Sequence, residues 1–458
     1  MKETSPAPCI PALPHEPERA QFVRSRIPSE GLFAGQDWRI APAPFQIGPE
    51  LASDLENLGR VLLQFYRAAN LLYRQSAAGK QPPWVAAWLD QGKPADIIEL
   101  QRDPAFKNDL PRVIRPDLLL TDSGLALTEL DSVPGGIGLT AWLNQTYSEL
   151  DQAQQSHSPA AGRVIGGRDG MQSGFASIFG EAQNVHLVVS DESGTYRPEM
   201  NWLARAIDPQ RVQVRDPQFT SFSAGDAVYR FFEMFDVAHV PSAPVAFDLA
   251  RRRVIRLTPP PKPFLEEKIW LALLWNRHLQ DFWRRELGQS FLERLLKLVP
   301  YSWVVDPAPL PPQGAIPELN LTDWRQLKLF SQRDRNLILK ESGFSEHAWG
   351  ARGVYLGSDL PVEEWSKAVD LAVESFGRRP FILQRYHKPA LFHSRWFDFD
   401  RGIAEEMDGR VRLCPYYFVA GEGDRARAKL SGVLATICPA NKKIIHGMKE
   451  AILAPCAA

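Results

Sequence analysis

Apolar residues recur at helical spacing near the beginning of the chain. Between residues 51 and 75, Leu51, Leu55, Leu58, Leu62 and Phe65 follow one another at intervals of three or four. This spacing places apolar side chains along one face of a helix. The pattern therefore predicts a helix over 51–75 with a buried apolar stripe.

The pattern at 113–130 is instead that of strands. The segments VIRPDLLL and LALTEL flank the turn TDSG, and a Pro-Gly-Gly loop and the apolar stretch GLTAWL follow. Short apolar runs around a polar, glycine-containing turn are typical of a β-hairpin. We expect two antiparallel strands here.

The remainder of the chain alternates between the two patterns. Runs at 184–191, 211–217 and 226–236 predict strands and 197–207 predicts a helix, which indicates a small α/β layer. Residues 264–298 predict one or two amphipathic helices interrupted near Gly288. Further helices are expected at 319–331 and 361–376, and further strands at 336–340, 353–357, 380–387, 410–419 and 431–439. The expected fold class is mixed α/β (α+β).

Proline clusters divide the chain. They lie within residues 1–48, at 257–263 and at 306–317, and proline interrupts regular structure because it fixes φ and has no amide hydrogen. A length of 458 residues leaves room for two to four domains of roughly 100–200 residues each. We expect a proline-rich N-terminal arm over 1–50, followed by segments at 51–160, 161–300 and 301–458.

Composition and charge exclude several classes of protein. The 53 Lys and Arg against 54 Asp and Glu give a formal net charge of -1, whereas nucleic-acid-binding proteins are usually strongly basic. Cys9, Cys414, Cys438 and Cys456 have the spacing of neither a zinc site nor a disulfide framework. The apolar run at 269–275 is too short to span a bilayer, and the first residues lack the apolar core of a signal peptide. We expect a soluble, cytoplasmic protein without nucleic-acid or membrane partners.

Three carboxylates fall on the predicted hairpin. Asp117 belongs to its first strand, and Glu129 and Asp131 end the second. Magnesium takes oxygen ligands and keeps positions open for nucleotide phosphates, so these three residues are candidate magnesium ligands. Arg115 lies two residues before Asp117, shares its strand face and is a candidate for contacting a phosphoryl oxygen. The alternative interpretation is a charged hairpin edge that faces water.

A lysine and three glycines follow the strand at 336–340. Lys340 ends that strand, and Gly343, Gly350 and Gly353 lie in the next loop. Glycine-permitted turns beside a lysine can contact phosphates, and the loop would fold over them as a lid. The alternative interpretation is an ordinary surface hairpin, since many of these contain lysine and glycine.

Gln384 and Tyr386 end the strand at 380–387. Amide and backbone groups at such a strand edge can bind an adenine. An ordinary strand that leaves the core has the same appearance.

A competing phosphate motif lies after the hairpin. Gly136, Gly138 and Ala141 match the G-x-G-x-x-A form of the dinucleotide-binding fingerprint. That fold requires an acidic residue at the end of a second strand about twenty residues later, and the segment at 151–162 is polar and poor in strand formers. A dinucleotide-dependent oxidoreductase is therefore the less favoured alternative.

Taken together, these motifs resemble the ATP-grasp enzymes, and within them the circularly permuted branch of glutathionylspermidine synthase-like carboxylate-amine ligases. RPD at 115–117 and ELDSVPG at 129–135 come first, and Lys340, the lid and ILQRY at 382–386 come more than 200 residues later. In the usual ATP-grasp chain these two halves occur in the opposite order. The resemblance covers roughly residues 100–438.

The resemblance implies a fold and a domain plan. It implies a circularly permuted ATP-grasp fold with a pre-ATP-grasp α/β domain. Residues 51–160 would be the first ATP-grasp segment with the magnesium-binding hairpin, and 161–300 the pre-ATP-grasp domain and its helices. Residues 301–458 would be the second ATP-grasp segment with the lysine strand, lid and adenine hinge.

The resemblance also implies an activity. It is ATP-dependent ligation of a small-molecule or peptide carboxylate to an amine, through an acyl phosphate, with ATP and Mg2+ as cofactors. The implied roles are catalytic for Arg115 and Arg412, metal binding for Asp117, Glu129 and Asp131, and nucleotide binding for Lys340, Gly343, Gly350, Gly353, Gln384 and Tyr386. Lys268 corresponds to a lysine in the family's helix, although a solvated helix face is the favoured interpretation.

Two departures from the family's pattern keep a catalytically silent nucleotide-binding protein as an alternative. The E-x-N motif appears here as Glu129-Leu130-Asp131, which adds a negative charge near the phosphates. The lid, GFSEHAWGARG, is longer and bulkier than the Gly-Ser-rich loop of the family. The terminal segment from 431 matches no site, and the substrates and oligomeric state stay open.

Overall fold

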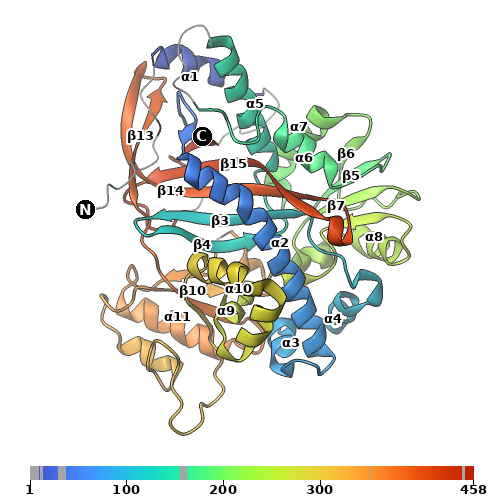
Figure 1. Ribbon diagram of the computed structural model, residues 1–458, viewed down its shortest axis with the longest axis vertical. Helices are drawn as coiled ribbons and strands as arrows, with labels where there is room; N and C mark the ends of the chain where they lie inside the picture. The colour runs from blue at the N-terminus through green and yellow to red at the C-terminus, as the bar shows by residue number, and fades with distance from the viewer. Residues whose placement is uncertain (1–9, 11–13, 29–37, 155–161, 351, 446–448) are drawn as a thin grey trace.

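The described residues form three sheets, which Figure 1 shows surrounded by helices. The computed structural model describes residues 10, 14–28, 38–154, 162–350, 352–445 and 449–458. The predicted mixture of helices and strands is therefore present.

The largest sheet crosses the middle of the molecule in Figure 1 and is mainly antiparallel. Its order is β1 (Arg39–Ile40), β16 (Ile452–Ala457), β15 (Arg427–Pro439), β14 (Ile403–Ala420), β3 (Val113–Thr121) and β4 (Gly124–Asp131). In addition, β13 (Leu391–Asp398) pairs with β14, and β2 (Phe45–Gln46) pairs with β16. The predicted hairpin at 113–130 is thus β3 and β4, with Thr121 opposite Gly124 at its turn.

A second antiparallel sheet lies below the first in Figure 1. Its order is β11 (Val354–Leu356), β10 (Leu337–Glu341), β12 (Phe381–Arg385) and β9 (Ser302–Val304). The helix α11 (Val362–Glu374) packs on it through Trp365, Val369 and Ala372, which are buried. Because β10 is buried along its whole length, Lys340 near its end is an unusual residue for its surroundings.

The third sheet is parallel and contains the α/β layer expected within 184–236, together with the additional strand β8 (Arg256–Thr258) and helix α8 (Ser242–Arg251). Its order is β6 (Val212–Arg215), β5 (Val185–Val189), β7 (Ala227–Phe231) and β8, with α7 (Arg197–Ile207) and α8 beside it. Every residue of β5 and β7 is buried. Parallel strands covered on both faces read as continuous apolar runs, which explains why these strands were visible in the sequence.

The helix predicted at 51–75 is α2 (Pro49–Ala77), which runs diagonally across the large sheet in Figure 1. Its buried residues include Leu55, Leu58, Leu62 and Phe65, as the apolar stripe predicts. The other helices of the main body are α3 (Pro83–Asp90), α4 (Ala95–Arg102), α5 (Ile137–Gln154) and α6 (Gly170–Ser177).

The segment 264–298 contains two α-helices and a second break. They are α9 (Ile269–Trp275) and α10 (Gln280–Leu298), and Gly288 within α10 has φ 73°, ψ 159°. The predicted interruption near Gly288 is confirmed, while the break at Asn276 was not foreseen. The predicted helix at 319–331 is largely wrong: only Trp324–Leu329 is helical, as a short 3-10 helix capped by Asp323.

The region expected to be an extended arm contains regular structure. Glu16–Ser25 forms α1, and β1 and β2 pair in parallel with β16 from the other end of the chain. Strands of two residues have no readable alternation, so the sequence pattern could not predict them.

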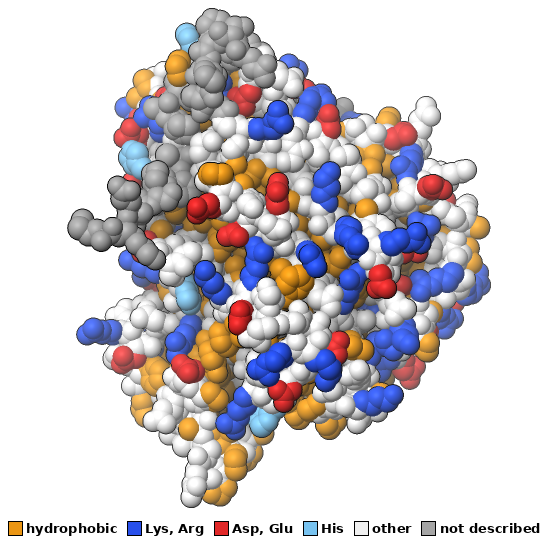
Figure 2. Space-filling model, viewed as in Figure 1, with side chains coloured by type: hydrophobic (Ala, Val, Ile, Leu, Met, Phe, Trp, Pro, Cys, Tyr) orange, Lys and Arg blue, Asp and Glu red, His pale blue; other side chains and the backbone are white. Residues whose placement is uncertain are grey.

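Figure 2 shows Lys and Arg side chains interspersed with Asp and Glu on the face that carries α2. Within the part of the chain that the structure describes, each helix is either too short or too polar to span a bilayer. Cys414, Cys438 and Cys456 are buried free thiols, and Cys9 lies outside the described residues.

The N-terminus of α5 is held by a carboxylate from α7. Glu199 accepts hydrogen bonds from the backbone N–H of Gly136 at 2.7 Å and of Leu139 at 3.1 Å. The backbone N–H groups at the start of a helix favour the ionised form of a carboxyl group and so lower its pKa. Burial has the opposite effect and is the larger of the two, and the pKa of Glu199 is raised to about 7. This contact joins the parallel-sheet layer to the helix that follows the hairpin.

Replacing Gly138 with alanine should destabilise the fold by about 1–3 kcal/mol, because the added methyl group overpacks this interface. Its Cβ would lie 2.3 Å from the backbone oxygen of Glu199. The measurement is urea denaturation against Gly194→Ala, where an added Cβ meets no atom within 4 Å. Equal stability of the two variants would contradict the packing described here.

Candidate active site

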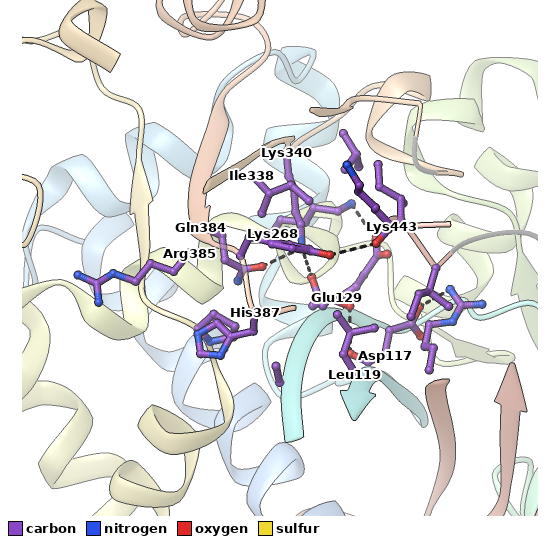
Figure 3. Close-up of a pocket in the computed structure, with 18 of the residues that line it drawn as sticks. Asp117, Leu119, Glu129, Lys268, Ile338, Lys340, Gln384, Arg385, His387 and Lys443 are labelled. Carbon is purple, nitrogen blue, oxygen red and sulfur yellow. Dashed lines mark hydrogen bonds and ion pairs between the residues drawn. The ribbon is translucent and has the colours of Figure 1, made fainter. Parts of the chain in front are cut away.

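A cavity lies between the two antiparallel sheets (Figure 3). The hairpin contributes Asp117, Thr128 and Glu129, and the lower sheet contributes Lys340 and Gln384. The cavity and its open mouth together hold about 800 Å³ of space free of atoms. Glu129 and Lys340 therefore line one cavity although 211 positions separate them in the chain.

Lys340 reaches from β10 across to the hairpin. Its Nζ donates to the backbone oxygen of Thr128 and to Oε1 of Gln384, both at 2.8 Å. Burial lowers its pKa to about 8, because the ammonium is removed from water. It makes no ion pair within the described part of the chain, so it is a buried cation at a cavity wall.

Two of the candidate metal ligands are bound by arginines. Arg115 Nε lies 2.9 Å from Asp117 Oδ1, and Arg115 also lies 3.1 Å from Asp131 Oδ2. Arg412 of β14 lies 3.0 Å from Asp117 Oδ2. Burial raises the pKa of Asp131 to about 6, in spite of the opposing Arg115 charge. The predicted shared face of Arg115 and Asp117 is thus confirmed, and their charges compensate each other.

The third carboxylate, Glu129, is paired with Lys268. Lys268 Nζ lies 2.8 Å from Glu129 Oε1 and donates to the backbone oxygen of Ala348 at 2.6 Å. Burial favours a higher pKa for Glu129, but the Lys268 ammonium outweighs it and the pKa is lowered. The interpretation of Lys268 as part of a solvated face is wrong. It precedes the first residue of α9, and its side chain is 11% exposed at the cavity.

A second cavity adjoins the first and shares Glu129, Lys268 and Ala348 with it. Its lining is acidic and aromatic, and it includes Asp131, Glu233, Glu266, Glu267, Phe235, Phe344 and Trp349. Burial and the neighbouring Glu266 raise the pKa of Glu233 well above the ordinary range. The sequence does not reveal these three glutamates as site residues, because they lie in loops and a short helix and form no spacing motif.

The lid glycines have different surroundings. Gly343 lines the second cavity, whereas Gly350 and Gly353 line neither cavity. Arg352 lies 3.0 Å from Glu192, and the rings of Trp349 and Tyr196 are in edge contact. The loop therefore packs against the parallel-sheet layer. Ala351 lies outside the described residues.

The two candidate adenine residues both line the first cavity. The Gln384 side chain is already engaged, since it accepts from Lys340 and donates to Ser302 Oγ at 3.0 Å. The Tyr386 hydroxyl donates to the backbone oxygen of Lys443 at 3.3 Å.

Residues 443–445 also line this cavity. They belong to the terminal segment to which no site was assigned from the sequence. The signal available there was the apolar pair Ile444-Ile445 after two lysines, which is too common to mark a site.

The site is suited to an anion. Arg412 Nε is buried and has no hydrogen-bond partner among the described residues, and it stands at the same cavity as Lys340. Leu119, Ile338 and Val354 add apolar wall. Buried cations beside an apolar surface fit a ligand with phosphates and a planar base.

Magnesium fits this donor set only together with phosphates. No three His, Cys, Asp or Glu side chains in the described ranges are grouped to hold a metal ion. However, magnesium commonly takes one or two protein carboxylates and completes its shell with phosphates and water. Glu129 and Asp117 line the cavity that Lys340 lines, and Asp131 lines the adjoining one. Glu129 is the more available, since both oxygens of Asp117 contact arginines.

The dinucleotide interpretation does not fit the structure. The motif requires a free helix N-terminus for a pyrophosphate, whereas the N-terminus of α5 is occupied by Glu199. It also requires parallel strands on both sides of the helix, whereas α5 follows the antiparallel strand β4.

Replacing Arg115 with methionine should lower the free energy of unfolding by about 3 kcal/mol, because a buried carboxylate is left without its cation. Asp131 would lose the guanidinium 3.1 Å away, while Asp117 would keep Arg412. Urea denaturation would measure the loss. Arg284→Met, which removes an exposed pair with Asp281, is the control and should change stability by about 1 kcal/mol or less. Similar losses in both proteins would argue against the role of Arg115.

Comparisons with known proteins bear on the fold. No family model and no curated protein matches the sequence. The structure is similar to a glutathione synthetase-like effector from Globodera pallida, with a TM-score of 0.56, 11% identity and 96% of each chain covered. A protein from Methylobacillus flagellatus KT, named provisionally as a gamma-glutamylcysteine synthetase, gives a TM-score of 0.37 at 11% identity. The match covers 81% of this chain and 87% of that one, and the score is too low to bear on the fold.

At 11% identity the likeness to the effector shows the fold alone. The mixed α/β class and the ATP-grasp architecture expected from the sequence are thereby confirmed. The chain has the ATP-grasp-like fold of the glutathione synthetase-like protein.

Proposed function

We propose that the protein is an ATP-dependent ligase that joins a carboxylate to an amine through an acyl phosphate. The observation that carries the proposal is the common cavity of Glu129 and Lys340, which come from different sheets and distant parts of the chain. A cation for phosphates and a carboxylate for their metal ion must face the same cleft in such an enzyme.

The nucleotide would lie along the first cavity. Its phosphates would contact Lys340 and Arg412, and the lid containing Gly343, Gly350 and Gly353 would cover them. The base would lie toward Ile338 and the strand end with Gln384 and Tyr386. Support comes from the buried cations Lys340 and Arg412, which line this cavity, and from its apolar wall.

Mg2+ would be held by Glu129 with Asp117 and Asp131 nearby, and when bound it would offset negative charge on the phosphates. Arg115 and Arg412 would stabilise the acyl phosphate. An oxygen of the carboxylate substrate attacks the terminal phosphorus and ADP leaves. The amine nitrogen then attacks the acyl carbon, phosphate leaves, and the nitrogen loses a proton.

The second cavity would receive the amine. It adjoins the first at Glu129 and Lys268, and its lining carries Glu233 and Glu266 together with aromatic rings. The carboxyl oxygens of Glu233 and Glu266 can accept hydrogen bonds from an amine, and the aromatic faces attract its charged form. The shared wall would bring the nitrogen close to the reacting acyl carbon.

We also propose that the chain order is circularly permuted. The hairpin precedes the lysine strand by about 200 residues, and the parallel sheet lies between them in sequence. The corresponding segments would be 1–50, 51–160, 161–300 and 301–458, as laid out from the sequence.

Replacing Glu129 with Gln should abolish ATP turnover while the protein stays folded, because the amide keeps the shape and loses the charge. Phosphate release with ATP, Mg2+ and pools of carboxylates and amines measures the turnover.

Replacing Lys340 with Met should weaken ATP binding by about tenfold or more, since it removes a buried phosphate contact. Calorimetry with ATP measures the affinity. The matched control is Lys367→Met, an exposed lysine of α11.

Full turnover in Glu129→Gln, or unchanged affinity in Lys340→Met, would overturn these assignments. Tight ATP binding by the unmodified protein without turnover on any substrate pool would favour the catalytically silent alternative.

ATP binding near pH 8 should be accompanied by proton uptake. The pKa of Lys340 is lowered to about 8 by burial, and adjacent phosphates should raise it again. At pH 8 the lysine should gain about half a proton on binding, and at pH 6 almost none, because it is already charged there. Calorimetry in buffers of different ionisation enthalpy measures this uptake. Uptake that persists in Lys340→Met would show that another group is responsible.

A further inference from the structure

A buried polar network lies at the start of the lid. Lys93, in the loop between α3 and α4, forms an ion pair with Glu267 Oε1, and the two side chains are 0% and 2% exposed. Oε2 of Glu267 accepts a hydrogen bond from Ser342 Oγ at 2.7 Å. The same hydroxyl accepts from the backbone N–H of Ile269 at 3.1 Å. Three segments far apart in sequence therefore meet at one carboxylate.

An ion pair this deeply buried is not explained by stability. Removing two charges from water costs free energy, and well-packed apolar residues of similar volume commonly stabilise a protein as well or better. Lys93 also donates to the backbone oxygen of Leu89 at 2.6 Å, so both charged groups are well satisfied. The hydrogen-bonding groups of the network are thus satisfied. Since a gain in stability does not account for the buried ion pair, its position in the fold is the more informative property.

Both chain neighbours of the network belong to the proposed site. Glu267 is followed by Lys268, which contacts Glu129 and the lid oxygen of Ala348. Ser342 is followed by Gly343, the first lid residue, which has φ +119°. A Cβ at Gly343 would lie 3.5 Å from Glu267 Oε2. The Glu267 carboxylate therefore lies directly before Lys268 in the chain and is also hydrogen-bonded to the residue that precedes the lid.

We propose that Lys93 and Glu267 are positioning residues that fix the start of the lid through Ser342 and hold Lys268 beside it. Lys93 orients Glu267 through their ion pair, and Glu267 transmits this order to both segments. The inference rests on the proposed function only in naming the loop a nucleotide lid, since the network is present without any ligand.

The test is limited chymotrypsin digestion of the full-length, nucleotide-free protein, with cleavage at Phe344 and Trp349 followed by mass spectrometry. Ser342→Ala breaks only the link to the lid and should accelerate this cleavage by roughly five- to tenfold, the effect of one lost hydrogen bond. Ser76→Ala is the matched control. Ser76 is also buried and hydrogen-bonded, to Pro82 and Ala86, and neither of these partners belongs to the lid. Its cleavage rate should equal that of the unmodified protein.

A double-mutant cycle tests whether residues 93 and 342 act through the same carboxylate. Lys93→Met should also accelerate lid cleavage, and the double variant should be cleaved no faster than the faster single variant. Additive effects would overturn the inference, as would unchanged cleavage in Ser342→Ala or equal acceleration in Ser76→Ala. If Lys93→Met does not fold, the Ser342→Ala comparison decides alone.

The outcome is distinguishable from failure of the proposed function. If ATP does not bind but Ser342→Ala loosens the lid, the network positions the loop and the ligase proposal fails. If ATP is turned over and the lid is cleaved at the same rate in all variants, the positioning proposal fails. In an active protein, Ser342→Ala should raise the KM for ATP about fivefold or more with a smaller change in kcat, because a looser lid first weakens binding.

Discussion

The ammonium group of Lys340 is enclosed where two antiparallel sheets meet, and this enclosure constrains the rest of the site. Its hydrogen bonds to Thr128 and Gln384 tie the hairpin to the lower sheet. A cation buried between sheets requires acceptors at fixed positions, and the registers of β3 with β4 and of β10 with β12 supply them. The two sheets consequently approach each other around a cavity whose wall carries charged groups as well as apolar side chains.

The charges around this junction divide the space in two. On one side, Lys340 and Arg412 face a cavity that is partly apolar, and on the other Glu233 and Glu266 face an acidic one. The pair of Lys268 and Glu129 forms the boundary and belongs to both. In the proposed ligase, the phosphates would meet the cations of the first cavity and the amine would meet the carboxyl oxygens of the second, so the two reactants would lie in adjoining places.

The parts of the fold that could be predicted are those with a long or distinctive local pattern. The apolar stripe of α2, the β3–β4 hairpin and the buried runs of β5 and β7 all appear in the sequence. Each of these elements is long enough for its pattern of apolar and polar residues to be recognised without knowledge of its partners. The pairing of β1 and β2 with β16 depends on a partner about 400 residues away and leaves no local pattern. The position of Lys268 was misjudged for a related reason. Whether a lysine beside an apolar helix is solvated depends on what covers that helix, and here the hairpin and the lid do.

The departure at Asp131 shows how distant residues decide the meaning of a motif. From the sequence, aspartate in place of the family's asparagine adds a negative charge near the phosphates. The structure places Arg115 at 3.1 Å from that carboxylate, and burial raises its pKa to about 6. Each effect reduces the charge that a phosphate would meet, since a guanidinium offsets the carboxylate and a raised pKa favours its neutral form. Arg115 is itself held by Asp117 on the neighbouring strand position of the same face. The positive charges of Arg115 and Arg412 therefore nearly balance the negative charges of Asp117 and Asp131. Aspartate at position 131 is thus no obstacle to an anion in the cavity.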